Sequence, residues 1–96
     1  MTTETIRTSS GEEFEVRLES TPTTGYAWEV AQLPENVELL GTEFEPSGGE
    51  PQAGAPGNQL FRFQARQAGQ YQIDFVLKRQ WELEGIQSHT VNVEVN

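Results

Sequence analysis

Apolar and polar residues alternate along most of the chain in the period-2 pattern typical of half-buried β-strands. The clearest example covers residues 70–78, where Tyr71, Ile73, Phe75 and Leu77 occupy every second position. Residues 31–40 are the only candidate for a helical pattern, and Pro34 and Val37 argue against it. The alternation predicts strands near residues 2–7, 12–19, 26–31, 37–44, 58–65, 70–78 and 87–95.

Residues typical of turns separate these segments, at Ser10-Gly11, Pro34-Glu35-Asn36, Ala68-Gly69 and Gly85. About seven short strands joined by regular turns favour an all-β sandwich. The length of 96 residues predicts one domain, residues 1–96, with a modest hydrophobic core. We expect large aromatic side chains to supply most of that core, namely Phe14, Trp28, Phe44, Phe61, Phe63, Tyr71 and Phe75.

The join between the second and third predicted strands has an unusual composition. It contains, in order, Thr21, Pro22, Thr23, Thr24, Gly25 and Tyr26. Pro22 fixes its own φ angle and biases Thr21 towards an extended conformation, and Gly25 can adopt a positive φ. One interpretation is a plain connection. The other is a rigid, small and uncharged tip that inserts into a cleft of another protein.

Two later segments also have the composition of loops. Residues 46–58 are rich in Gly and Pro and lack apolar periodicity, so they form either a functional loop or an excursion with no role. Arg79, Gln80 and Trp81 follow the clearest strand, where the chain becomes polar again. Trp81 is therefore either a peripheral core residue or an exposed anchor of the type enriched in binding hot spots.

These three loops together resemble those of the chagasin family of cysteine-protease inhibitors. The family carries an Asn-Pro-Thr-Thr-Gly-Tyr/Phe loop, a Gly-x-Gly-Gly loop and an Arg-Pro-Trp/Phe loop, in that order. Residues 21–26 match the first loop at five of six places. The second loop aligns with Gly54, Ala55, Pro56 and Gly57, and the third with Arg79, Gln80 and Trp81. The resemblance extends over nearly the whole chain, because the intervening strands also align.

The resemblance implies an immunoglobulin-like β-sandwich of seven to eight strands with the three loops gathered at one end. It also implies reversible, competitive inhibition of papain-like cysteine proteases. Thr23 and Thr24 would lie over the catalytic thiol, and the other two loops would clamp the walls of the cleft. Three positions depart from the family pattern: Thr21 replaces Asn, Pro56 replaces Gly and Gln80 replaces Pro. The alternative function is an immunoglobulin-like adhesion or scaffolding module without a protease target.

Composition limits the other classes of function. The net charge of −9 argues against nucleic acid as a partner, because phosphates would be repelled. No apolar run approaches the length of a membrane span, so we expect no membrane partner. We also expect the protein to be a monomer. With no cysteine, the compartment is undetermined: cytoplasmic, or periplasmic or secreted if a leader precedes these residues.

Catalytic and metal chemistry find little support in the residues. A cysteine nucleophile is impossible, and we expect His89, the single histidine, to face solvent from the last strand. Glu43, Glu45 and Glu50 could in principle bind a hard cation, but they lack the spacing of a calcium loop. The sequence therefore predicts a protein that is not an enzyme and that uses no metal or other cofactor.

Overall fold

The computed structural model describes residues 2–20, 25–46 and 57–96. Within these residues the chain forms seven β-strands and no helix, which confirms the strands expected from the alternation. The boundaries shift by two residues at most. The strands are β1 (Thr2–Thr8), β2 (Glu13–Ser20), β3 (Tyr26–Gln32), β4 (Val37–Pro46), β5 (Gly57–Ala65), β6 (Gly69–Arg79) and β7 (Gln87–Val95).

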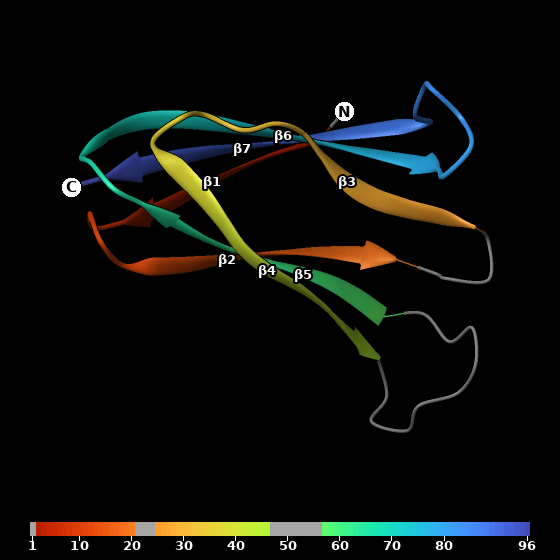
Figure 1. Ribbon diagram of the computed structural model, residues 1–96, viewed down its shortest axis with the longest axis horizontal. Helices are drawn as coiled ribbons and strands as arrows, with labels where there is room; N and C mark the ends of the chain where they lie inside the picture. Colours follow the sequence, from red (N-terminus) through yellow and green to blue (C-terminus); the bar gives the residue numbers. More distant parts are fainter. Residues whose placement is uncertain (1, 21–24, 47–56) are drawn as a thin grey trace.

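The strands form two layers (Figure 1). One sheet has the order β1-β7-β6-β3 and the other has the order β2-β5-β4. The β1–β7 pair is parallel, and the remaining pairs are antiparallel. This arrangement confirms the expected all-β sandwich and is consistent with an immunoglobulin-like fold. In the part of the chain that the structure describes, no helix is long and apolar enough to cross a membrane.

The core lies between the two sheets and is built by the alternation seen in the sequence. Along β2, every second residue from Phe14 to Ser20 is buried, and the residues between them are exposed. The phenyl rings at the centre pack against one another. The ring centroids are 5.5 Å apart for Phe14 and Phe63 and 5.0 Å apart for Phe61 and Phe75. The core cluster consists of Phe14, Val16, Leu18, Trp28, Val37, Phe61, Phe63, Ala65, Ile73, Phe75, Val91, Val93 and Val95.

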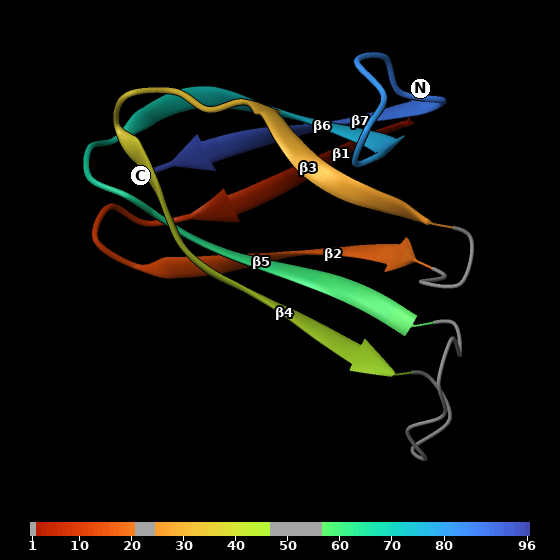
Figure 2. The same ribbon diagram turned by 45° about the vertical axis from the view of Figure 1, so that its right-hand side comes forward.

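Phe44 is not part of this core, so that prediction was wrong. Its side chain is 42% exposed. Phe44 pairs with Gln59 across β4 and β5, and directly opposed residues share one face of a sheet, so Phe44 lies on the inner face. However, β4 is an edge strand, and it diverges from β3, the edge of the other sheet, towards the end where Phe44 lies (Figures 1 and 2). The ring consequently lacks a covering layer. Tyr71, also expected in the core, is half-buried and packs against it.

The expectation that His89 faces solvent was also wrong. His89 is only 8% exposed, because it lies in phase with the buried Val91, Val93 and Val95 of β7. Strand β7 has a neighbour on both sides, β1 and β6. The imidazole lies near the rings of Trp28 and Phe75, and its Nε2 is 2.9 Å from Oε1 of Glu4 on β1. A polar side chain at a buried position is thus paired across the parallel strands.

The loop expected over residues 46–58 is shorter at both ends. Strand β4 continues to Pro46 and β5 begins at Gly57, and these two residues pair with each other. A proline is compatible with this position because β4 is an edge strand. Residues 47–56, which carry the rest of the expected loop, lie outside the described residues.

Candidate functional site

The strand ends that flank all three candidate loops lie at one end of the sandwich (Figures 1 and 2). Ser20, the last residue before the first loop, pairs with Gly57, and Gly57 also pairs with Pro46. Tyr26, the first strand residue after that loop, pairs with Arg79, the last residue of β6. The strand pairing therefore places the flanks of loops that are far apart in sequence side by side.

The structure describes only part of the predicted site. Thr21, Pro22, Thr23 and Thr24 of the first loop and Gly54, Ala55 and Pro56 of the second lie outside the described residues. Gly57, the remaining residue of the second motif, is buried at the start of β5. Gly25, Tyr26, Arg79, Gln80 and Trp81 are all described, and they lie together.

The end of the first loop packs against the third loop. Gly25 has a φ of 80°, a left-handed conformation that favours glycine. A Cβ atom on Gly25 would lie 3.8 Å from Cη2 of Trp81, so the indole lies against this part of the backbone. Beside it, the guanidinium carbon of Arg79 lies 4.6 Å from the ring centroid of Tyr26 and 5.9 Å from that of Trp81. The cation–π contact between Arg79 and Tyr26 thus links the end of the first loop to the start of the third.

Trp81 itself is 74% exposed. Of the two interpretations that the sequence left open, the structure supports the exposed one, since a peripheral core residue would be covered. Among the described residues of the first loop, Gly25 lies against one edge of the indole, and the exposed surface of Trp81 is open to a partner. An exposed Trp held in place by neighbours is suited to act as a binding anchor.

Local hydrogen bonds shape the third loop. The N–H of Glu82 donates to the carbonyl of Arg79 at 3.0 Å, which places Gln80 and Trp81 at the two central positions of a turn. Lys78 Nζ donates to the carbonyl of Glu82 at 3.3 Å, and Arg79 Nε lies 3.7 Å from Glu82 Oε1. The first central position of a common turn accepts proline readily. Gln80 therefore occupies a position where the family's Pro fits the backbone.

The far side of the third loop is pinned to β6. The N–H of Ile86 donates to the carbonyl of Leu77 at 2.9 Å. A Cβ atom on Gly85 would collide with Cγ2 of Val76, so only glycine allows this close approach. The loop is thus attached to the sheet before and after its exposed residues.

Two residues that the sequence did not single out for the site hold the base of the first loop. Trp28 Nε1 donates to the carbonyl of Glu19 at 2.9 Å, which links β3 to β2 two residues before the loop begins. The Gln59 side chain accepts from the N–H of Trp28 at 2.7 Å and donates to its carbonyl at 3.3 Å. The available signal was a polar residue in phase with the buried Phe61 and Phe63 of β5. These bonds fix the strand ends between which residues 21–25 run.

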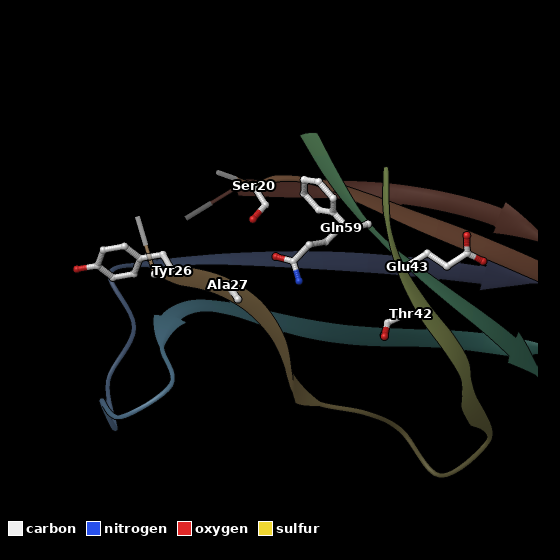
Figure 3. Close-up of a pocket in the computed structure, with 8 residues that line it drawn as sticks. Ser20, Tyr26, Ala27, Thr42, Glu43 and Gln59 are labelled. Carbon is white, nitrogen blue, oxygen red and sulfur yellow. The ribbon is translucent and has the colours of Figure 1, made fainter. Parts of the chain in front are cut away.

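A hollow of about 450 Å³ lies beside this base, between β3 and β4. Figure 3 shows Gln59 pointing from β5 towards β3 and Ala27, with the Tyr26 ring at the outer end. The exposed Phe44 also lines the hollow, together with Ser20, Gly25, Thr42 and Glu43. Gln59 is already bonded to Trp28, so this surface is mainly an apolar recess beside the first loop.

Cation binding gains no support from the described residues. Glu43 and Glu45 form ion pairs with Arg62 and Arg17, with N–O distances of 2.7 Å and 3.9 Å. Glu50 lies outside the described residues. Among residues 2–20, 25–46 and 57–96, no group of three or more His, Cys, Asp or Glu is arranged to hold a metal ion.

Comparison with known proteins gives one family and several similar structures. The family model described as "Chagasin family peptidase inhibitor I42" matches residues 7–95. A search of the curated proteins finds no significant match. The crystal structure of the cysteine protease inhibitor EhICP2 from Entamoeba histolytica has a TM-score of 0.76 at 21% identity, covering 99% of this chain and 93% of that one.

Two further structures share the fold. The solution structure of amebosin has a TM-score of 0.76 at 25% identity, and the match covers 100% of this chain and 99% of amebosin. PbICP-C, solved in complex with falcipain-2, has a TM-score of 0.60 at 20% identity, with 98% of this chain and 89% of PbICP-C covered. The likeness therefore extends over the whole sandwich.

Proposed function

The chain belongs to the chagasin family of peptidase inhibitors, and on this premise we propose that it is a reversible, competitive inhibitor of papain-like cysteine proteases. Two of the similar proteins support this target class: EhICP2 is a cysteine protease inhibitor, and PbICP-C was solved in complex with falcipain-2. Membership of an inhibitor family favours this function over an adhesion module and over an enzyme. We further propose that residues 1–96 act as a single inhibitor domain.

One observation carries the proposal beyond family membership: the first and third loops share a fixed base. Gly25 packs against the indole of Trp81, and Tyr26 lies under the guanidinium of Arg79. A loop held at its base enters a cleft with little loss of conformational freedom, and this pre-organisation improves affinity. The geometry supports a wedge made of the first loop, with the third loop beside it.

The proposed mechanism needs no chemistry from the inhibitor. A cysteine protease cleaves when its thiolate attacks a substrate carbonyl that is correctly presented in the cleft. Following the family resemblance, Thr23 and Thr24 would lie over the thiol, with small side chains that admit close backbone approach. A rigid loop can occupy this space while its carbonyl groups remain misaligned for attack. The protease is then blocked and the inhibitor stays intact.

The two other loops would contact the walls of the cleft. Trp81, with Arg79 and Gln80 beside it, provides an exposed aromatic anchor on one side. On the other side, we assign contact to Gly54, Ala55 and Pro56. Gly57 is buried and paired with Ser20 and Pro46, which supports a role in anchoring the second loop to the sheet.

A titration tests the proposal. The purified domain is added to papain or a cathepsin-L-type enzyme with a fluorogenic peptide substrate, and it is afterwards analysed by mass spectrometry. We expect competitive inhibition that is reversed by dilution, with an intact chain between Thr21 and Tyr26. The absence of inhibition at high micromolar concentration would favour the adhesion module, and rapid scission in the first loop would identify a substrate.

A further inference from the structure

Three exposed apolar side chains lie close together in sequence on the loop between β6 and β7. Trp81 is 74% exposed, Leu83 is 98% exposed and Ile86 is 62% exposed. Leu83 and Ile86 lie beyond the Arg79–Trp81 motif, and the function proposed above does not use them. Single exposed leucines are common on protein surfaces, but a cluster of large apolar residues on one loop is typical of an interaction surface.

The exposure of this cluster is imposed by the backbone. The bond from the Ile86 N–H to the Leu77 carbonyl and the close approach of Gly85 to Val76 hold the end of the loop on β6. The turn closed by Glu82 and Arg79 holds its beginning. A flexible loop could fold its leucine back onto the core, whereas this loop is fixed at both ends and presents Leu83 to solvent. The arrangement is pre-organised for a partner.

The position of the cluster indicates which partner it meets. In both views the β6–β7 loop stands on the side of its sheet that faces away from β2, β5 and β4 (Figures 1 and 2). The strand ends that flank the first loop, Ser20 and Tyr26, therefore lie between those of the second loop and the β6–β7 loop, since Ser20 pairs with Gly57 and Tyr26 pairs with Arg79. A protease that receives the first loop in its cleft would meet Leu83 and Ile86 outside the clamp formed by Trp81, at the rim of the cleft.

We propose that Leu83 and Ile86 form a specificity surface that contacts an apolar patch on the rim of the bound protease's cleft. This inference rests on the proposed inhibitory function and extends it. All papain-like enzymes need the same reactive groups in the cleft, but the chemistry does not constrain the rim. Contacts at the rim can therefore discriminate between proteases that the first loop alone would bind equally.

Charge favours a protein over a lipid partner for this surface. Exposed Trp, Leu and Ile side chains could also enter a membrane interface. The net charge of −9 would repel the anionic lipids of a membrane surface. The nearest cations, Lys78 and Arg79, lie close to Glu29 and Glu82, at 3.4 Å and 3.7 Å. A protease rim of neutral, apolar character suits the loop better.

The test compares inhibition constants for the parent, Leu83→Ser, Leu83→Met and Leu33→Ser. Leu33 is an exposed leucine, 38% accessible, that directly follows the end of β3 away from the first loop. Each variant is titrated against papain and a cathepsin-L-type enzyme, and its denaturant midpoint is measured. Co-sedimentation with phosphatidylcholine vesicles, with and without phosphatidylserine, is measured in parallel.

We expect Leu83→Ser to weaken inhibition of at least one of the enzymes about tenfold or more, as the loss of a buried leucine contact predicts. The factor by which Leu83→Ser weakens inhibition should differ between the two enzymes. Leu83→Met should inhibit as well as the parent, and Leu33→Ser should leave both inhibition constants unchanged. Inhibition within twofold of the parent for Leu83→Ser on both enzymes would overturn the proposal. Vesicle binding that Leu83→Ser abolishes, with unchanged inhibition, would overturn it in favour of a lipid surface. A parent protein that inhibits neither enzyme would overturn the proposed function and this inference with it.

Discussion

The guanidinium carbon of Arg79 lies 4.6 Å from the centroid of the Tyr26 ring. These residues are direct partners across β3 and β6, at the end of the first loop and the start of the third. The contact therefore couples two loops that are separated in sequence by four strands, β3 to β6, and by the second loop. It provides a physical reason why the two loops act as one surface.

Arg79→Ala should weaken inhibition about tenfold, because it removes the cation from both aromatic rings and from Glu82. Its effect on stability should be small, since an exposed cation–π contact contributes about 0.5–1 kcal/mol. Inhibition titration and denaturant unfolding measure the two effects. Arg7→Ala is the control, because Arg7 forms a comparable exposed ion pair with Glu94, at 2.8 Å, on the opposite strand ends. Equal inhibition by the two variants would contradict the coupling.

Trp81→Ala should leave the fold nearly as stable as the parent, because the indole is largely exposed. Loss of a hot-spot aromatic costs about 2 kcal/mol of binding, or about thirtyfold in the inhibition constant. The matched variant is Trp28→Ala, which removes a buried indole and should lower stability by about 3–5 kcal/mol. The denaturant midpoint and the inhibition constant of each variant distinguish a Trp that anchors the protease from a Trp that belongs to the hydrophobic core. A large midpoint decrease for Trp81→Ala would refute the anchor role.

Gln80→Pro should stabilise the protein by about 0.4–1 kcal/mol and leave inhibition equal or tighter. Gln80 is the first central residue of the turn closed by Arg79 and Glu82, and no described residue other than glycine has a positive φ. Proline fits such a position, and the preceding Arg79 is in a strand, as proline requires. Thermal unfolding measures the change. A destabilised variant would show that the turn depends on the Gln80 N–H or on a different φ.

Gln59→Leu should destabilise the protein by about 1–3 kcal/mol, because it leaves the N–H and the carbonyl of Trp28 without their partner. The loss falls at the base of the first loop, so inhibition should weaken as well. Gln64→Leu is the control: Gln64 donates to the Gly11 carbonyl at 2.7 Å in an exposed setting, where water can replace it. Denaturant unfolding of both variants is the measurement. Equal losses of stability in the two variants would show that the bonds from Gln59 to Trp28 stabilise the protein no more than an exposed hydrogen bond.

The alternation of residues was sufficient to predict the strands, because each strand has one buried and one exposed face. His89 was misjudged from its polar character, although its phase with Val91 and Val93 indicated burial. For Phe44, an apolar side chain and an inward phase both indicated burial, yet the residue is exposed. Its phase is inward, but β4 is an edge strand that diverges from β3, and the covering of a strand depends on the other sheet.

The candidate site was predictable in composition but not in geometry. The motifs identified Tyr26, Arg79 and Trp81 without showing that Tyr26 and Arg79 are paired, because strand order is a long-range property. Gln59 was missed since its role depends on a contact with Trp28 in the other sheet. The exposure of Trp81 was undecided in the sequence, because a Trp at a strand end is compatible with both settings.

Thr23→Arg should abolish inhibition with little change in stability. The proposal places Thr23 in the narrowest part of the cleft, where a bulky cation would clash or be buried without a partner. Residues at loop tips contribute little to the stability of the folded core. Gln52→Arg adds the same side chain in the second loop, and its effect should be smaller. If Thr23→Arg inhibits as well as the parent, the first loop is not the inserting element.

The most direct test measures the rate at which iodoacetamide alkylates the catalytic thiol of papain in the presence of the domain. The account predicts that the rate falls in proportion to the fraction of papain in complex, because the first loop covers the thiol. Thr23→Arg at the same concentration should leave the rate at that of free papain. An unchanged alkylation rate at saturating parent inhibitor would contradict insertion of the first loop over the thiol.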